Sequence, residues 1–498
     1  MIVDKMLLFM EAHQPVRLSR RLVEELPLKE DGLFDHALNR EILNRVADKC
    51  YNRVVETLWK AAKRYEKEWG DLKVVVGISG VLLRALETWR RDTFRLLEEA
   101  ARSGLIEIVA QTYYHSLASI FSLEEFRLQV SSYMDLVREV AGRQPIAAEN
   151  TEYIYNDLFA EALVSLGAKV LFTEGVTRVL GGKAPTEIYR VARGDARLLL
   201  RHYRLSDDIG FRFSARWWSE WPLTASKYAR WVTDTPGEIL VIGLDMETFG
   251  EHHWPETGIF DFLEWLPVEL IRKGPVELVA ASDLVNAEAS HTLSVGLYDT
   301  ISWADEERDL SAWLGNSMQQ ISFWRLASLR GMAAESGDEL LDTWRFLGIS
   351  DHFYYMSTKR GSAGEVHMYF NPYDTPHEAF LVYNLALNRL ERKLACKASN
   401  SSLRRCLLSR KRLYDKAFHF TPTSFKALNL EELMLSVFKV PPPYLERHVK
   451  QGNISRWITE SFREDNLASQ IEELKGLPED MIRERLFLVL QAFLHGEN

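Results

Sequence analysis

Acidic side chains close several apolar runs in the first 290 residues of this sequence. Glu11 ends the first run, Glu149 and Glu152 follow the fourth, and Asp245 and Glu247 close a later one. Carboxyl groups that act in pairs serve glycoside hydrolysis, in which one carboxylate attacks the sugar carbon and the other carboxyl group transfers a proton. A carboxylate at the end of a strand can also serve solubility or cap the next helix. These residue types alone leave both interpretations open.

The runs that carry these acids predict a parallel α/β fold. Short apolar, β-branched stretches alternate with segments of helical periodicity. No run is followed by a Gly-rich phosphate loop, which favours a barrel over a dinucleotide-binding fold. In such barrels the reactive groups gather at the carboxyl ends of the strands. The predicted strands are Met6–Glu11, Val74–Ser79, Ile106–Gln111, Ile146–Asn150, Lys169–Glu174, Arg197–Leu205, Ile239–Asp245 and Glu277–Ser282.

Helical periodicity dominates the second half of the chain. Within the barrel it predicts one helix over Val81–Ala101, and Ser122 begins a capping box for the next helix. Beyond the barrel it predicts helices over Leu310–Ala333 and Glu378–Leu394. The polar stretch 397–402 indicates a linker, and a helix-rich tail follows it. We therefore expect a barrel, a helical domain and a helical C-terminal extension.

Composition excludes several classes of function. The net charge of −10 provides no basic surface for a nucleic acid backbone. Three cysteines, without metal-ligand spacing, favour a reducing compartment, and we expect the cytoplasm. Asp4, Lys5 and Glu11 interrupt any signal-peptide core, and no apolar run is long enough to span a membrane. The partner expected from sequence is a small or polymeric substrate rather than nucleic acid or a membrane.

A set of motifs in fixed order narrows the chemistry. They are His13–Pro15, Gly77–Gly80, Asn150–Asn156, Leu244–Trp254, Trp313–Asn316 and Ser350–Met356. Together they resemble glycoside hydrolase family 57, in particular its archaeal α-amylase branch. The resemblance extends over the first 395 residues. Each motif alone is weak, and the order in which they occur gives the resemblance its specificity.

The resemblance implies an incomplete (β/α)7 TIM-like barrel followed by an α-helical domain and a helical C-terminal tail. It divides the chain into a catalytic barrel over 1–295, a helical domain over 296–395 that completes the cleft, and an extension over 396–498. A seven-stranded barrel leaves one of the eight predicted strands outside, and we expect this to be Arg197–Leu205. The family's nucleophile corresponds to Glu152 and its acid/base to Asp245, which implies retention of configuration through a covalent intermediate.

The two predicted catalytic residues need opposite protonation states. An apolar setting beside Leu244, Met246 and Phe249 would keep Asp245 protonated, while Glu152 must stay ionised. Other polar and aromatic residues are predicted to bind the sugar, although each could instead be a satisfied structural residue or a core tryptophan. The predicted substrate-binding residues are His13, Gln14, His115, Glu247, Asp351, His352, Trp217, Trp221 and Trp254.

The expected activity is α-amylase-like hydrolysis of α-1,4-glucans such as starch, glycogen or maltooligosaccharides. Transfer to another glucan (4-α-glucanotransferase activity), α-1,6 cleavage of the amylopullulanase type, and non-catalytic glucan binding remain alternatives. His252 and His253 beside Glu251 raise a further alternative, a zinc deacetylase. Adjacent histidines diverge, however, and no HExxH-type spacing occurs. We therefore predict no metal and no cofactor, and the oligomeric state stays open.

Overall fold

Seven parallel strands form a ring in the computed structural model, which describes residues 2–24, 32–66, 70–359 and 371–496. β1 pairs with β2 and β8, and the ring continues from β2 through β3, β4, β5 and β7 to β8. A bridge between Ala110 and Ala148 joins β3 to β4. The predicted incomplete TIM-like barrel is therefore confirmed. Its strands are β1 (Lys5–Ala12), β2 (Val74–Ile78), β3 (Ile106–Ile108), β4 (Ala147–Ala148), β5 (Val170–Glu174), β7 (Arg197–Arg201) and β8 (Leu240–Asp245).

The prediction that Arg197–Leu205 lies outside the barrel is wrong. Its strand β7 pairs with β5 along its whole length and reaches β8 through Arg201 and Val241. The run 277–282 is the short one instead, because a 3-10 helix begins at Ala281. It forms only β9 (Glu277–Leu278), which pairs with the start of β1. Two more strands, β6 (Tyr189–Val191) and β10 (His291–Leu293), extend the sheet beside β7.

Alternation along the strands decides which residues face the barrel interior. Leu7 and Phe9 of β1 pack with Val75 and Val241 in one interior cluster. Their neighbours Met6, Leu8 and Met10 pack in another cluster, against the surrounding helices. Apart from Glu107 near the amino end of β3, the interior positions of this cluster are apolar until the last one of each strand. There the alternation places Glu11 of β1, and its partner in the register is Asp245 of β8.

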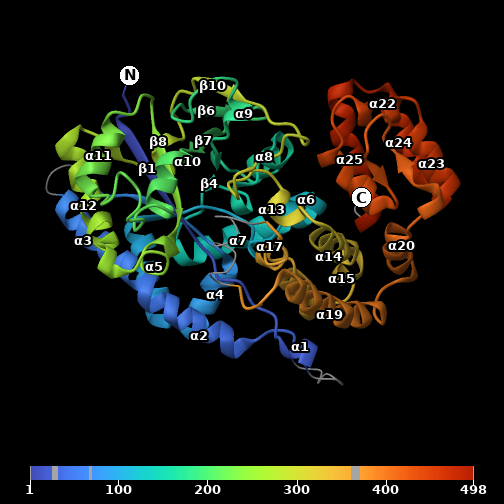
Figure 1. Cartoon of the computed structure of the whole chain (residues 1–498), viewed down its shortest axis with the longest axis horizontal. Helices are drawn as coiled ribbons and strands as arrows, with labels where there is room; N and C mark the ends of the chain where they lie inside the picture. The colour runs from blue at the N-terminus through green and yellow to red at the C-terminus, as the bar shows by residue number, and fades with distance from the viewer. Residues whose placement is uncertain (1, 25–31, 67–69, 360–370, 497–498) are drawn as a thin grey trace.

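Twelve helices among the described residues precede or surround the barrel strands (Figure 1). Ser122 caps α7 as predicted, because its hydroxyl accepts from the Glu125 amide at 3.1 Å. The single helix predicted over Val81–Ala101 is wrong: non-helical angles at Arg90 (φ −139°) separate two helices. The helices are α1 (Arg21–Glu24), α2 (His36–Val46), α3 (Asn52–Tyr65), α4 (Gly80–Trp89), α5 (Arg91–Ser103), α6 (Ala118–Phe121), α7 (Leu123–Ala141), α8 (Asp157–Ser165), α9 (Thr177–Leu180), α10 (Tyr203–Gly210), α11 (Ala225–Thr233) and α12 (Ile259–Lys273).

The rest of the described chain is largely helical, as expected. The segment 310–333 contains three helices rather than one, since Asn316 caps a new helix and the chain turns again at Leu329. The predicted linker is shorter than expected, because α20 begins at Asn400. These helices are α13 (Ser311–Leu314), α14 (Ser317–Ser328), α15 (Arg330–Ala334), α16 (Asp338–Leu347), α17 (Ser350–Tyr354), α19 (Pro376–Ala395), α20 (Asn400–Arg410), α21 (Leu430–Lys439), α22 (Tyr444–Lys450), α23 (Asn453–Phe462), α24 (Asp465–Glu473) and α25 (Glu479–His495).

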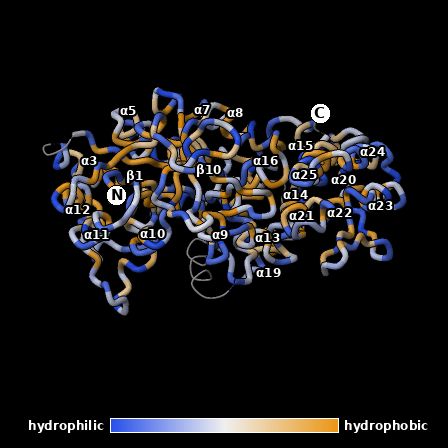
Figure 2. Tube along the Cα trace, turned by 90° about the horizontal axis from the view of Figure 1, so that it is seen from above, coloured by the Kyte–Doolittle hydropathy of each residue, from blue (hydrophilic) through white to orange (hydrophobic). Residues whose placement is uncertain are grey.

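The C-terminal helices α21–α25 lie at the opposite end of the molecule from α11 and α12, as the view from above shows (Figure 2). One hydrophobic cluster nevertheless runs from the barrel helix α7 through α14 and α19 to α25. The division at residues 295 and 395 stays a prediction, because this core is continuous across both boundaries. Among the described residues, none of the helices is long and apolar enough to cross a membrane.

Candidate functional site

Polar residues form the last inward-facing layer of the barrel. Below this layer lies an apolar cluster, with Glu107 of β3 as a buried acid nearer the other end of the barrel. Above the layer the chain leaves the strands, so these side chains lie at the carboxyl-end mouth, where barrel enzymes carry their active sites. With the exception of the partly exposed Asp245, each of the charged and amide side chains is buried. The layer consists of Glu11, Gly77, Gln111, Glu149, Glu174, Arg201 and Asp245.

Glu152 lies directly above this layer in a short 3-10 turn, Thr151–Tyr153. Its backbone has φ 60°, a left-handed conformation that costs a residue with a side chain roughly 1 kcal/mol or more. Its carboxylate accepts from Trp303 Nε1 at 2.5 Å and lies 3.4 Å from His115 Nε2. Trp303 also donates its backbone amide to the Glu152 carbonyl. The carboxylate is therefore fixed by a strained turn and two donors.

Asp245 ends β8 at the same mouth, opposite Glu11 in the strand register. Burial and, after it, the negative charges of Glu152 and Glu11 raise the pKa of Asp245 to about 7. The positive charges of Arg201 and His115 lower this pKa by a smaller amount. A carboxyl group with this pKa can hold a proton near neutrality and release it. Burial therefore has the effect on Asp245 that its apolar neighbours in sequence predicted.

Two stacked histidines connect the first strand to Glu152. The rings of His13 and His115 lie 4.2 Å apart, and His13 Nε2 is 3.2 Å from Asp351 of α17. Burial and the charge of His115 lower the pKa of His13 to about 4, so its ring is neutral. Burial also lowers the pKa of His115, but the hydrogen bond and charge of Glu152, with the charge of Glu11, outweigh it and raise this pKa to about 9. His115 is thus positively charged beside Glu152.

Gln14 and Glu247 meet on the other side of the mouth. Gln14 Nε2 donates to Glu247 Oε1 at 3.3 Å, and the Tyr51 hydroxyl donates to the same oxygen at 2.5 Å. Burial, followed by the charge of Asp245, raises the pKa of Glu247 to about 8. Two acidic groups with raised pKa values therefore lie near each other, two residues apart along the chain.

The remaining predicted site residues lie apart from this cluster. Trp217, Trp254 and Trp221 are exposed, with 82%, 62% and 43% of their surfaces accessible. His253, next to Trp254, connects its own loop to the segment that leads to Trp217 and Trp221. Its ring nitrogens lie 2.7 Å from Ser214 Oγ and 2.9 Å from the Ile209 carbonyl. His352 is buried, and its ring packs against Tyr383. No contact that joins these four residues to Glu152 is present among the described residues.

The sequence predictions missed two residues that organise the mouth. Trp303 comes from the segment after the barrel, and nothing in its local sequence indicates contact with Glu152. Arg201 donates to Glu174 and Asp207, both at 2.7 Å, and to the Gly243 carbonyl of β8 at 2.8 Å. Its inward position in β7 could have been predicted, had the strand not been assigned outside the barrel.

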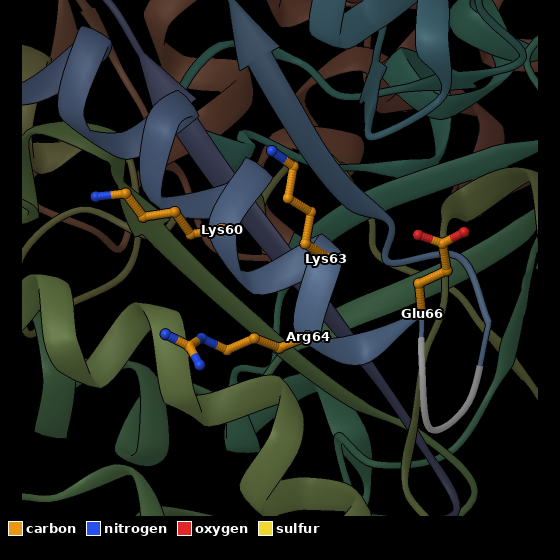
Figure 3. A pocket seen from close by; sticks show the side chains of 4 residues that line it. All are labelled: Lys60, Lys63, Arg64 and Glu66. Carbon is orange, nitrogen blue, oxygen red and sulfur yellow. The ribbon is translucent and has the colours of Figure 1, made fainter.

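Other features of the surface offer less chemistry. The described residues contain no group of three or more His, Cys, Asp or Glu side chains placed to hold a metal ion. A hollow lined by Lys60, Lys63, Arg64 and Glu66 occurs on the surface beside α3 (Figure 3). Arg64 there is bound to Glu264 at 2.7 Å. The mouth of the barrel therefore remains the candidate site.

Fold and site together define the class of protein. An incomplete parallel barrel whose mouth carries an ionisable pair of acids, one of them with a raised pKa, is the arrangement of a barrel glycoside hydrolase. The profile of the family "Glycosyl hydrolase family 57" matches residues 7–296. The chain belongs to glycosyl hydrolase family 57, which confirms the resemblance inferred from its motifs. It is a glycoside hydrolase by family.

Relatives of known description agree with this assignment. A protein of Methanocaldococcus jannaschii described as "Putative alpha-amylase" is 41% identical over 384 residues, which cover 75% of this chain and 81% of that protein. The fold is similar to a 4-alpha-glucanotransferase from Thermococcus litoralis (TM-score 0.56, 14% identity, 86% of this chain). This chain covers only 63% of that enzyme. A branching enzyme from Thermococcus kodakaraensis gives a TM-score of 0.55 at 15% identity, covering 81% of this chain and 94% of that one.

Proposed function

We propose that this protein hydrolyses α-1,4-glucans with retention of configuration, through a covalent glycosyl-enzyme intermediate on Glu152. The observation that carries the proposal is the contrast between the two acids at the mouth. Glu152 is held by Trp303 and the positively charged His115, which favour its anion. Asp245 is desolvated and faces negative charge, which favours its protonated form. The surroundings of the two acids thus differ in the direction that a double displacement requires.

In the first step Glu152 attacks the anomeric carbon, and the bond to the leaving sugar oxygen breaks. Asp245 donates its proton to that oxygen, so the leaving glucan departs with a neutral hydroxyl group. In the second step Asp245, now ionised, takes a proton from water. The water oxygen then displaces Glu152 from the anomeric carbon. Two inversions give net retention.

Sugar hydroxyl groups need donors and acceptors around this pair. His13, Gln14, His115, Glu247 and Asp351 surround the mouth and are proposed to bind the glucose unit at the cleavage point. The exposed rings of Trp217, Trp221 and Trp254 are proposed to stack on further units of the chain, since aromatic faces pack on sugar C–H faces. His352 has the weakest support, because its ring packs against Tyr383 rather than toward Glu152.

The cellular setting and the domain division are proposed on simpler grounds. Cys50, Cys396 and Cys406 are all free thiols, which supports a reducing cytoplasmic compartment. The segment 296–395 is proposed to complete the cleft, because its α17 supplies Asp351 and its first residues supply Trp303.

Product analysis on maltoheptaose tests the proposed activity. Hydrolysis predicts shorter maltooligosaccharides from the first turnover, with α-anomers formed initially. Early appearance of products longer than seven units would show transfer to a glucan instead, and release of products only from branched substrates would show α-1,6 cleavage. Binding of amylose without release of reducing ends would contradict the enzymatic proposal and favour a glucan-binding protein.

A further inference from the structure

Two buried carboxyl groups, those of Glu11 and Glu149, meet in the polar layer beneath Glu152. Only 5% of Glu11 and 2% of Glu149 are exposed. Both carboxyl groups occupy the space beside Gly77, where a Cβ would collide with Glu11 Oε2 and Glu149 Oε1. A side chain at residue 77 would therefore separate the two acids or displace them. Gly77 belongs to one of the motifs that the proposed mechanism leaves without a role.

The two facing oxygens lack a donor. Among the described side chains, none donates to Glu11 Oε2 or to Glu149 Oε1. Ionised carboxylates only accept hydrogen bonds, and two of them in contact repel strongly. The two groups are nevertheless within side-chain hydrogen-bonding reach of each other. One proton on either carboxyl group satisfies both oxygens and removes the repulsion.

The surroundings decide which residue carries that proton. Glu11 Oε1 accepts from Gln111 Nε2 at 3.0 Å and lies 3.6 Å from His115 Nδ1. Burial raises the pKa of Glu149 well above its usual range, and the charges of Glu11 and Glu152 raise it further. The Gln111 donor and the His115 cation both lie beside Glu11 and stabilise its ionised form. The proton therefore resides on Glu149 and the negative charge on Glu11.

Other ionisable groups that face the pair do not change this assignment. Tyr133 of α7 is buried and donates to the Ile78 carbonyl, and burial raises its pKa well above the usual value. Burial has the same effect on Tyr153, which keeps both phenols neutral. Asp245 is favoured in its protonated form, and Arg201 supplies a positive charge that is already bound to Glu174 and Asp207.

We propose that Glu11 and Glu149 share one proton, and that the single remaining charge, on Glu11, keeps His115 doubly protonated against Glu152. The contacts form a continuous path, because His115 Nδ1 lies 3.2 Å from Gln111 Oε1 and the Gln111 amide donates to Glu11. Glu11 and Glu149 are then positioning residues that act through His115. The proposal rests on the proposed role of Glu152 as nucleophile, which needs a cation beside it to remain ionised.

The ionisation of His115 can be measured without catalysis, by following its imidazole ¹⁵N resonances across a pH titration of the full chain. Glu11→Gln removes the charge, and we expect the proton affinity of His115 to fall by about tenfold or more. Glu149→Gln keeps an amide donor toward Glu11, so the His115 midpoint should move by much less. Glu107→Gln is the matched control: it neutralises a buried glutamate of β3 that is bound to Ser282 instead. An unchanged His115 midpoint in Glu11→Gln would overturn the proposal.

The shared proton has its own infrared signature. At neutral pH the wild-type protein should show the C=O stretch of a protonated carboxyl group that is lost in Glu149→Gln and kept in Glu107→Gln. This measurement remains available if Glu11→Gln does not fold. A difference spectrum without that band would contradict the shared proton.

Kinetics separate this proposal from the proposed function. If both hold, Glu11→Gln lowers kcat by about tenfold or more with little change in KM, and the acidic limb of its pH profile moves upward. Glu149→Gln should retain more activity than Glu149→Leu, which removes the donor. If the His115 midpoint shifts in Glu11→Gln but the pH profile of activity does not, the shared proton is supported. The same result would contradict the role of Glu152 as nucleophile.

Discussion

Buried charges are arranged differently in the barrel mouth and in the C-terminal helices. In the helices, Glu446 of α22 and Arg483 of α25 are both buried and bound to each other at 2.8 Å. At the mouth, Glu11, Glu149 and Asp245 face other acids. Each has a raised pKa, and burial is the largest cause of the rise. Paired charges serve packing, whereas acids that face one another destabilise the fold and persist where chemistry uses them.

Backbone strain follows the same division. His115, Glu152 and Tyr153 have φ of 49°, 60° and 55°, and all three lie at the mouth. Arg463, the non-glycine residue with positive φ among the described residues of the C-terminal helices, forms the C-cap of α23, where a left-handed residue is an ordinary way to end a helix. The mouth therefore combines acids that face one another with left-handed backbone, a combination that the described residues of the C-terminal helices do not show. Changes at the two regions should thus affect different measurements.

Removal of the proposed nucleophile should give the largest effect. Glu152→Gln keeps the shape of the side chain but cannot form the covalent intermediate, and we expect kcat to fall by roughly 10⁴-fold or more. The thermal midpoint should not fall, because the change removes a charge that repels Asp245 and Glu11. Reducing-end assays and calorimetry measure the two quantities. Glu107→Gln serves as the control, with wild-type kcat.

Breaking the buried ion pair of the C-terminal helices should lower stability and leave kcat unchanged. Arg483→Met leaves Glu446 buried without its cation, and we expect a loss of about 3–5 kcal/mol in the free energy of unfolding. The kcat of the folded enzyme should stay unchanged. Adding Glu446→Gln to the same chain should restore part of the stability. A large loss of kcat in the folded single variant would show that this region contributes to the site.

The pKa of Asp245 predicts how activity depends on pH. Proton donation requires the protonated form, so kcat/KM should fall as the pH rises through about 7, which gives the alkaline limb of the pH profile. Asp245→Asn should lower kcat by about 10²- to 10⁴-fold on substrates that need a proton donor. Substrates with a good leaving group, such as maltosyl fluoride, should lose less. An equal loss on both substrates would contradict the acid role.

The same pKa predicts an effect on stability. Asp245 has a higher pKa in the folded than in the unfolded chain, so the folded state binds more protons between about pH 4 and 7 and its stability falls as the pH rises. Asp245→Asn cannot ionise and avoids this loss. The variant should therefore exceed the wild type in thermal midpoint at pH 8, and the difference should shrink at pH 4.5. Equal differences at both pH values would argue against a desolvated Asp245.

The exposed tryptophans should give the smallest effect. Trp217→Ala removes a ring that is 82% exposed, and we expect KM for long glucans to rise several-fold, or about 1 kcal/mol, with kcat unchanged. Maltotriose, which has fewer units to place on the ring, should show a smaller change. Phe425→Ala, an exposed aromatic residue beside the C-terminal helices, is the control.

Local patterns in the sequence predicted the barrel and its acids well. Continuous apolar runs marked the strands, and the acids that close two of them, Glu11 and Asp245, lie at the carboxyl ends of β1 and β8, paired in the register. The break at Arg90 was missed, because nothing in the periodicity of 81–101 interrupts a helix. Trp303 was missed because its contact with Glu152 joins residues 151 positions apart. The Glu11–Glu149 pair also depends on three separate strands meeting at Gly77. Such convergence has no signature within any one segment.

Chemical rescue with azide tests the division of labour between Glu152 and Asp245 most directly. In Glu152→Ala, azide can enter the space of the missing carboxylate and attack the α-linked substrate once, which predicts a β-glycosyl azide. In Asp245→Ala, azide can replace water in the second displacement, which predicts an α-glycosyl azide. Products of these opposite configurations would support the account. The same configuration from both variants, or rescue of neither, would contradict it.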